Sequence, residues 1–155
     1  MLPAMSAPSY QTIVVGTDGS ETAQRAVDTA FALARALDAQ LHVVTAYRPL
    51  TDREVYERQR GLTPSEAEQV DEAVEARALL GRIAKAAAEA GIRMRVHAGL
   101  GSPGEVLVEV ATEVGADLVI VGSRGMSGVR RVLGSVPNHV THHAPCSVLV
   151  VRTDG

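Results

Sequence analysis

The stretch DLVIVGSRGMSGVRRVLGSVPNHVTHHAPCSVLVV, residues 117–151, decides the fold. It begins and ends with short apolar, β-branched runs at 117–121 and 147–151, and glycines punctuate the segment between them. A strand that feeds a glycine-rich loop and then a helix is how a parallel α/β sheet builds a phosphate cradle, because N–H groups of the first helical turn point at the anion. Ser135 is expected to cap this helix and to offer its hydroxyl to the same ligand.

The same alternation of apolar runs and amphipathic segments continues through the rest of the chain. Strands are expected at residues 12–16, 41–47, 92–98, 117–121 and 147–151. Helices are expected to start at the capping residues Ser20, Thr63, Ser102 and Ser135. The order βαβαβαβαβ with continuously apolar strands predicts a parallel sheet with helices on both faces. Ligands of such sheets bind beyond the carboxyl ends of the strands, at the point where the strand order switches.

Length, composition and charge indicate one globular domain and argue against several classes of protein. The chain has 155 residues, and 46% of them are hydrophobic. Its net charge of −3 argues against a surface that binds nucleic acid through general electrostatic attraction. No apolar run approaches the ~18 residues of a membrane span, and the N-terminus lacks the pattern of a signal peptide. A cytoplasmic protein without nucleic-acid or membrane partners is therefore expected. Residues 1–10 are predicted to be a disordered tail and residues 11–155 a single domain.

Two other motifs are interpreted as structural. Residues 99–104 match G-x-G-x-x-G, but Pro103 removes one backbone N–H, so a tight turn followed by a helix start is the preferred interpretation. His139 and His143 are four residues apart and would share one helix face with His142 nearby. Because no third ligand is evident in the sequence, a solvated or partly packed helix face is preferred to a metal site. The P-loop pattern G-x-x-x-x-G-K-[ST] does not occur.

Asp18 lies in the turn that follows the first predicted strand, on the rim of the sheet where ligands bind. A turn aspartate or a helix cap is the other common use of this residue type, and Asp18 by itself leaves the two readings open. Together with the turn at 122–135, the turn at 16–20 is expected to flank a crevice. A carboxylate there could hold ribose hydroxyls or a Mg²⁺ ion that bridges phosphates.

The motifs VVGTDGS at 14–20 and VGSRG at 121–125 through LGSVP at 133–137 resemble the universal stress protein family. The order of elements also matches over about residues 11–152. The resemblance implies a five-stranded parallel sheet of order 3-2-1-4-5, of the adenine nucleotide alpha hydrolase-like type. It also implies ATP binding through the motif G-x2-G-x9-G-[ST]. Here eight residues, not nine, separate Gly125 from Gly134, and the additional Gly128 widens the backbone conformations open to this shorter loop.

The resemblance assigns the ligand contacts residue by residue. Gly122 and Gly125 would line the phosphates, Gly134 and Ser135 would hold the β- and γ-phosphates, and the backbone near Ala46 would meet adenine. Asp18 would contact ribose or metal, and positive charge at the loop favours an anion. The predicted nucleotide-binding set is Gly16, Thr17, Asp18, Ala46, Gly122, Arg124, Gly125, Gly134, Ser135 and Val136, with ATP and Mg²⁺ as cofactors and Asp18 as the metal ligand.

The leading functional hypothesis is an ATP-binding stress sensor or regulator. Enzymatic turnover is not expected, because no residue stands out as a base poised to activate water. Two alternatives stay open, namely a nucleotide-free interaction module and a cyclic AMP binder that uses the same crevice.

The last strand, residues 146–152, predicts how the chain associates. In the inferred topology this apolar strand lies at the edge of the sheet and contains no proline or lysine. Antiparallel pairing with the same strand of a second copy would form a closed homodimer. Cover of this edge by the N-terminal tail or by residues 48–62 is the alternative.

Overall fold

The computed structural model describes residues 9–48, 52, 53, 56, 60, 61, 72–123 and 133–153. Its main elements are β1 (Thr12–Gly16), α1 (Glu21–Leu37), β2 (Gln40–Tyr47), α4 (Glu72–Glu89), β3 (Met94–Leu100), α5 (Pro103–Val114), β4 (Leu118–Gly122), α6 (Ser135–His143) and β5 (Ser147–Val151). The strands form one sheet of order β3-β2-β1-β4-β5, and each neighbouring pair is parallel. The predicted fold class and strand order are confirmed.

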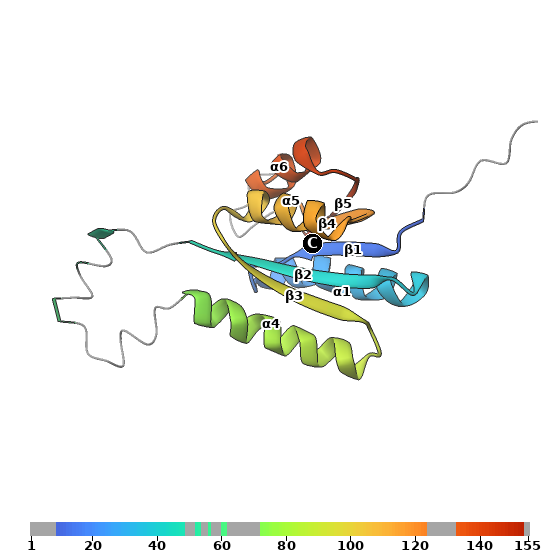
Figure 1. Ribbon diagram of the computed structural model, residues 1–155, viewed down its shortest axis with the longest axis horizontal. Coiled ribbons are helices and arrows are strands. Elements are labelled where there is room, and N and C mark those ends of the chain that lie inside the picture. Colours follow the sequence, from blue (N-terminus) through green and yellow to red (C-terminus); the bar gives the residue numbers. More distant parts are fainter. Residues whose placement is uncertain are drawn as a thin grey trace, which may run out of the picture.

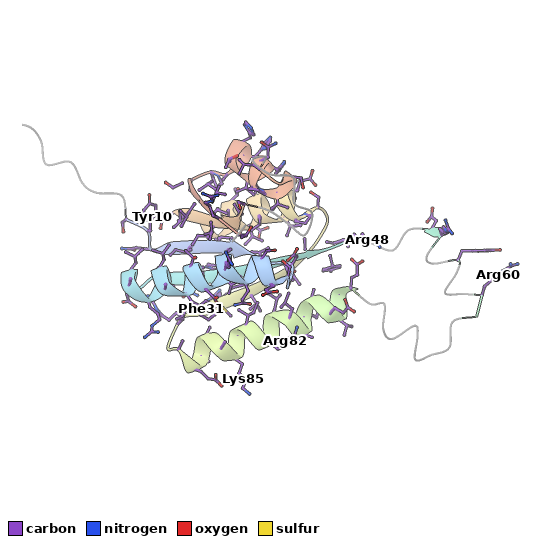
Figure 2. The ribbon with its side chains drawn as sticks, turned by 180° about the vertical axis from the view of Figure 1, so that it is seen from behind. Tyr10, Phe31, Arg48, Arg60, Arg82 and Lys85 are labelled. Atoms are coloured by element: carbon purple, nitrogen blue, oxygen red, sulfur yellow. The ribbon has the colours of Figure 1, made fainter. Side chains whose placement is uncertain are left out.

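Helices cover both faces of the sheet (Figure 1), with α5 and α6 on one face and α1 and α4 on the other. Seen from behind, α1 crosses in front of the sheet and α4 lies below it (Figure 2). Alternate residues of β1 supply both cores: Ile13 and Val15 pack toward α1 and α4, and Val14 packs toward α5 and α6. All three are fully buried, so β1 is the shared wall of two hydrophobic layers.

The switch point of the sheet lies between β1 and β4. β1 pairs with β2 along its whole length and with β4 on its other side through Ile13–Val15. The connection from β1 to β2 leads away from β4, whereas the connection from β4 to β5 leads away from β1. The segments that leave β1 and β4 therefore diverge, which opens a crevice at their carboxyl ends.

Helix and strand boundaries confirm one detail of the sequence interpretation and correct two others. Ser20 caps α1 as predicted, because its Oγ accepts a hydrogen bond from the Ala23 N–H at 3.1 Å. At α6 the capping residue is Gly134, and Ser135 is the first helical residue, so the predicted serine cap is wrong there. The third strand begins at Met94 and not at residue 92.

Other sequence interpretations fall on residues whose structure is outside the described part of the chain. These are the helix start at Thr63, residues 1–8 of the predicted tail, and the loop residues Arg124 and Gly125. Tyr10, the last residue of the predicted tail, lies within the described part of the chain just before β1. Its hydroxyl donates a hydrogen bond to Ser147 Oγ at 3.3 Å. No helix among the described residues combines the length and the apolar character needed to cross a membrane.

Two histidines on neighbouring strands, the buried His42 of β2 and the partly buried His97 of β3, are in contact. His42 Nδ1 and His97 Nε2 are 2.9 Å apart, so one ring must donate and the other accept a hydrogen bond. Burial lowers the pKa of both imidazoles, and the positive charge of Arg95 lowers both further. The Glu113 carboxylate opposes this shift at His97 but does not cancel it. The folded protein therefore holds this pair in a form that resists protonation.

We expect the free energy of unfolding to fall as the pH drops below 6.5, the ordinary pKa of histidine. The unfolded chain binds protons in that range that the folded pair rejects, so stability is present above pH 6.5 and is lost on acidification. Urea unfolding followed by circular dichroism at about pH 7.5 and about pH 5 measures the loss. His97→Gln keeps a hydrogen-bonding side chain that does not titrate, and it should make the free energy of unfolding depend less steeply on pH. An equally steep dependence in the variant contradicts the assignment.

Candidate functional site

The turn after β1 forms one side of the crevice and is held by local hydrogen bonds. The Thr17 N–H donates to the Val44 carbonyl at 2.9 Å, and Thr17 Oγ1 accepts from the Gly19 N–H at 3.1 Å. Asp18 Oδ1 accepts from the Ser20 N–H at 2.9 Å, which is the turn role that the sequence left open. One such bond leaves most of the acceptor capacity of a carboxylate unused, and Asp18 is exposed. The side chain can therefore serve the turn and a ligand together.

The first turn of α6 forms the opposite side. The Asn138 N–H donates to the Gly134 carbonyl at 3.1 Å, which is the first main-chain bond of this helix. The N–H groups of Ser135 and Val136 precede it and have no carbonyl partner within the helix, and Pro137 carries no N–H. Two backbone donors and the Ser135 hydroxyl are thus concentrated at the positive end of the helix dipole, an arrangement suited to an anion.

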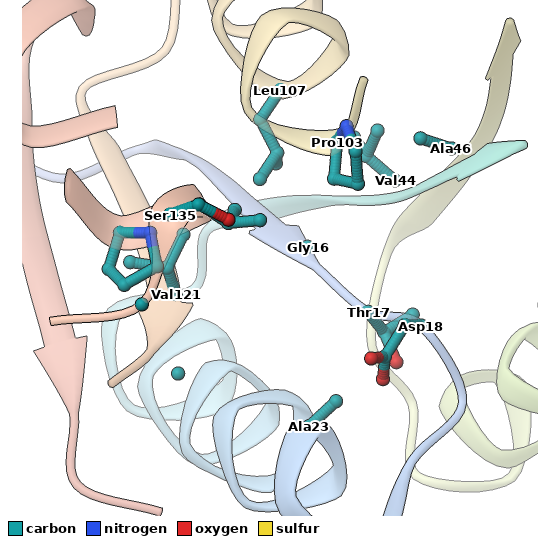
Figure 3. A pocket seen from close by; sticks show the side chains of 14 residues that line it. Gly16, Thr17, Asp18, Ala23, Val44, Ala46, Pro103, Leu107, Val121 and Ser135 are labelled. Carbon is teal, nitrogen blue, oxygen red and sulfur yellow. The ribbon is translucent and has the colours of Figure 1, made fainter. Parts of the chain in front are cut away.

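A cavity of about 160 Å³ lies between these two sides. Figure 3 shows Thr17 and Asp18 at one end, Ser135 at the other, and Gly16 between them. The wall that joins the two ends is apolar and includes Val44 and Leu107. The complete lining consists of Gly16, Thr17, Asp18, Ala23, Val44, Ala46, Pro103, Leu107, Val121, Gly122, Gly134, Ser135, Val136 and Pro137.

Every predicted site residue that the structure describes lines this cavity. Arg124 and Gly125 lie outside the described residues, so their places in the site stay predictions. The sequence interpretation missed the contribution of α5, which brings Pro103 and Leu107 to the apolar wall. The sequence did predict a helix that begins at Pro103. Because Pro103 is far from Asp18 along the chain, no sequence pattern indicated that both line one cavity.

Glycines let α5 approach the sheet closely. A Cβ atom at Gly16 would lie 2.6 Å from a methyl carbon of Leu107, and one at Gly99 would lie 2.3 Å from a methyl carbon of Val106. Gly104 is buried, and a Cβ there would lie 3.0 Å from His139 of α6. Gly99 and Gly104 thus have packing reasons and Gly101 has a conformational one, a φ of +137°, which supports the structural interpretation of that motif.

A second cavity of about 500 Å³ adjoins the first and shares Asp18 and Ala46 with it. Tyr47 lines it from the end of β2, and α4 contributes charged groups that include Glu72 and Arg82. Asp18 therefore lines both the apolar cavity and the cavity that holds the charged groups of α4. No group of three or more His, Cys, Asp or Glu side chains within the described part of the chain is arranged to hold a metal ion.

The histidines of α6 and the single cysteine lie outside this cavity. The rings of His139 and His143 stack with centroids 4.2 Å apart, as their spacing predicts. His143 Nδ1 is 2.9 Å from the His139 carbonyl, which accepts a hydrogen bond from it. Burial, with a further contribution from the Asp117 charge, raises the pKa of the Cys146 thiol, so Cys146 remains protonated near neutral pH.

The strand order of this parallel sheet reverses between β1 and β4, where Asp18 and the start of α6 line a crevice. These features define a doubly wound α/β protein with a crevice at its switch point. The chain belongs to the universal stress protein family, whose sequence model matches residues 9–152.

Individual relatives agree with this membership. A universal stress protein of Mycobacterium tuberculosis H37Rv is 37% identical over 147 residues, which cover 94% of this chain and 98% of that protein. A solved universal stress protein in complex with cAMP has a TM-score of 0.67 and 37% identity, and the match covers 94% of this chain and 99% of that one. UspA from Lactobacillus plantarum has a TM-score of 0.68 and 25% identity, with coverage of 92% and 98%. The predicted family is confirmed.

Contact between α5 and α6 can be tested through Gly104→Ala. The added Cβ would meet the Cβ of His139, which the α6 backbone holds in place, so the two helices must separate. We expect a loss of about 1–3 kcal/mol in the free energy of unfolding, the usual effect of overpacking. The matched control is Gly81→Ala in α4, where an added Cβ meets nothing within 4 Å. That change should stabilise the helix by roughly 0.5–1 kcal/mol, and equal urea midpoints for the two variants would contradict the packing argument.

Proposed function

We propose that the chain binds an adenine nucleotide in the crevice between β1 and β4 and acts as a cytoplasmic stress sensor or regulator. ATP with Mg²⁺ is the proposed ligand, in agreement with the glycine-rich motif of the sequence. The observation that carries the proposal is the placement of Asp18 and the first turn of α6 at opposite ends of one cavity. The Asp18 carboxylate and the backbone N–H donors of α6 line the same cavity, and an apolar wall lies between them.

The parts of the cavity match the parts of a nucleotide. Val44, Ala46, Pro103 and Leu107 offer apolar surface to a base, and a cavity of roughly 150 Å³ accommodates an aromatic ring. Asp18 would accept hydrogen bonds from ribose hydroxyls or ligate Mg²⁺, because carboxylate oxygen is a preferred ligand of that ion. The N–H groups of Ser135 and Val136 would receive phosphate oxygens.

A regulatory role is favoured over catalysis because the described part of the cavity lining offers one carboxylate and no histidine, cysteine or lysine. Asp18 is already engaged by the turn, and it would also face ribose or metal. The residues described here would therefore bind and orient the nucleotide without activating a water for its hydrolysis.

Cyclic AMP is a second candidate ligand for the same crevice. The solved relative with 37% identity was determined in complex with cAMP. The glycine-rich loop of this chain is one residue shorter than the G-x2-G-x9-G-[ST] pattern, and a single cyclic phosphate needs fewer loop contacts than a triphosphate. Both ligands share the base, the ribose and an anionic phosphate, so they would compete.

Calorimetric titration with Mg-ATP and with cyclic AMP tests the proposal, and we expect saturable binding of at least one of them. Gly134→Val should abolish binding without unfolding the protein, because Gly134 has φ −58° and ψ 167°, a conformation open to valine. Asp18→Ala should weaken Mg-ATP by about tenfold, the effect of losing one charge-assisted contact. Asp28→Ala on the exposed surface of α1 is the matched control. Absence of heat with both ligands, or wild-type affinity in Gly134→Val, would refute the site.

We also propose that β5 mediates a homodimer. Among the described strands β5 pairs only with β4, so its outer row of N–H and C=O groups points away from the sheet. Val148 and Val150 pack toward α5 and α6, while Leu149 and Val151 pack toward the other layer. Each of the four remains partly exposed, which leaves apolar area on both faces to bury against a partner strand.

Light scattering at tens of micromolar protein should give twice the mass of one chain. Val150→Lys should shift the population toward monomer, because an antiparallel partner strand would bury the added charge. Val74→Lys on α4 is the matched control, since Val74 is 53% exposed and lies away from β5. A wild-type protein with the mass of a single chain excludes the dimer, and equal masses for the two variants remove β5 from the interface.

A further inference from the structure

Three polar groups of one residue, Ser123, hold together segments that are distant in the sequence. Its N–H donates to the Val151 carbonyl at 2.7 Å, which extends the β4–β5 ladder beyond Gly122. Its carbonyl accepts from the Gly134 N–H at 3.0 Å. Its Oγ accepts from the Thr153 N–H at 3.1 Å and lies 3.2 Å from Thr153 Oγ1. Ser123 thus connects the end of β4, the start of α6 and the residues that follow β5.

Thr153 is a buried polar residue close to the end of the chain. Only 4% of its surface is exposed, although it lies two residues beyond β5 and follows the exposed Arg152. A buried N–H and hydroxyl are costly unless they are hydrogen-bonded, and Ser123 Oγ is a partner of both. The two hydroxyls therefore fix the path of the chain after β5 against the end of β4.

The bond from Gly134 to Ser123 determines which donors α6 presents. Since the Gly134 N–H is already used by the Ser123 carbonyl, the Ser135 and Val136 N–H groups are the ones left to face the cavity. Their direction depends on where Ser123 holds the N-terminus of the helix. Neither Ser123 nor Thr153 lines the cavity, so both would act on a ligand only through the position of α6.

We propose that Ser123 and Thr153 are positioning residues of the nucleotide site, which tie the first turn of α6 to the end of the edge strand β5. The inference rests on the proposed nucleotide function for its effect on binding. The hydrogen-bonded connection itself exists whatever the ligand. A displacement of β5 at its edge would reach the anion-binding N–H groups through Val151, Thr153 and Ser123, so binding and pairing at β5 would influence each other.

The decisive variants remove or restore one hydroxyl. Thr153→Val keeps the shape of the side chain and removes its Oγ1, whereas Thr153→Ser restores the hydroxyl. Thr112→Val is the matched control, because Thr112 Oγ1 donates to the Val108 carbonyl on the exposed surface of α5. Calorimetry with Mg-ATP and cyclic AMP should show affinity reduced about fivefold in Thr153→Val, the effect of one lost hydrogen bond. Thr153→Ser and Thr112→Val should retain wild-type affinity, and Ser123→Ala should behave like Thr153→Val.

Amide hydrogen exchange gives a readout that needs no ligand. In Thr153→Val the Gly134 amide should exchange about tenfold faster, while the Val14 amide in β1 reports any global loss of stability. If wild-type protein binds nucleotide and Thr153→Val binds equally well, the positioning role is overturned and the nucleotide function stands. If wild-type protein binds neither nucleotide, the proposed function fails and hydrogen exchange alone decides. An unchanged Gly134 rate relative to Val14 overturns the inference in either case.

Discussion

The double burial of β1 is the constraint on which the rest of the structure depends. Ile13, Val14 and Val15 have no exposed surface, so both faces of the strand need a helical layer. Parallel pairing on both edges requires crossover connections, and these are right-handed in nearly all proteins. The crossovers through α1 and α4 run in one direction across the sheet, while those through α5 and α6 run in the other. The two pairs of helices therefore lie on opposite faces, and the crevice opens where the directions part.

Polar anchors at both ends of β4 hold the switch point in register. At the beginning of the strand, Asp117 Oδ2 accepts hydrogen bonds from the N–H groups of Gln11 and Thr12 at 3.0 and 2.9 Å. At the end, Ser123 bonds to the strand that follows and to the start of α6. β4 is thereby tied to β1 before the crevice and to β5 beyond it. Asp117 thus has a structural role at the beginning of β4, whereas Asp18 on the opposite rim remains available to a ligand.

The cavity combines groups that satisfy different requirements. Its apolar wall comes from residues that also belong to the core, such as Val44 and Leu107, so its shape is as rigid as the packing around it. Its polar ends come from a turn and from a helix start, where backbone donors lack partners within the element. Both features support the adenine-nucleotide ligand proposed above. Selection among the proposed adenine nucleotides would fall to the polar ends, because the apolar wall would serve any of them.

The sequence alone determined the order of elements, the parallel sheet and the turns that flank the crevice. The spacing of apolar residues, the glycines and the capping residues are all local signals, so they can be recognised without the fold. It also indicated Asp18, Gly134 and Ser135 by their places after strands and before helices. Tertiary structure decided the rest. The 53% exposure of Val74 on α4 follows from how that helix packs, and Pro103 and Leu107 reach the cavity only through the packing of α5. The contact between Ser123 and Thr153 spans 30 residues of sequence, and no local pattern specifies such a contact, because it exists only once β4 and β5 have paired.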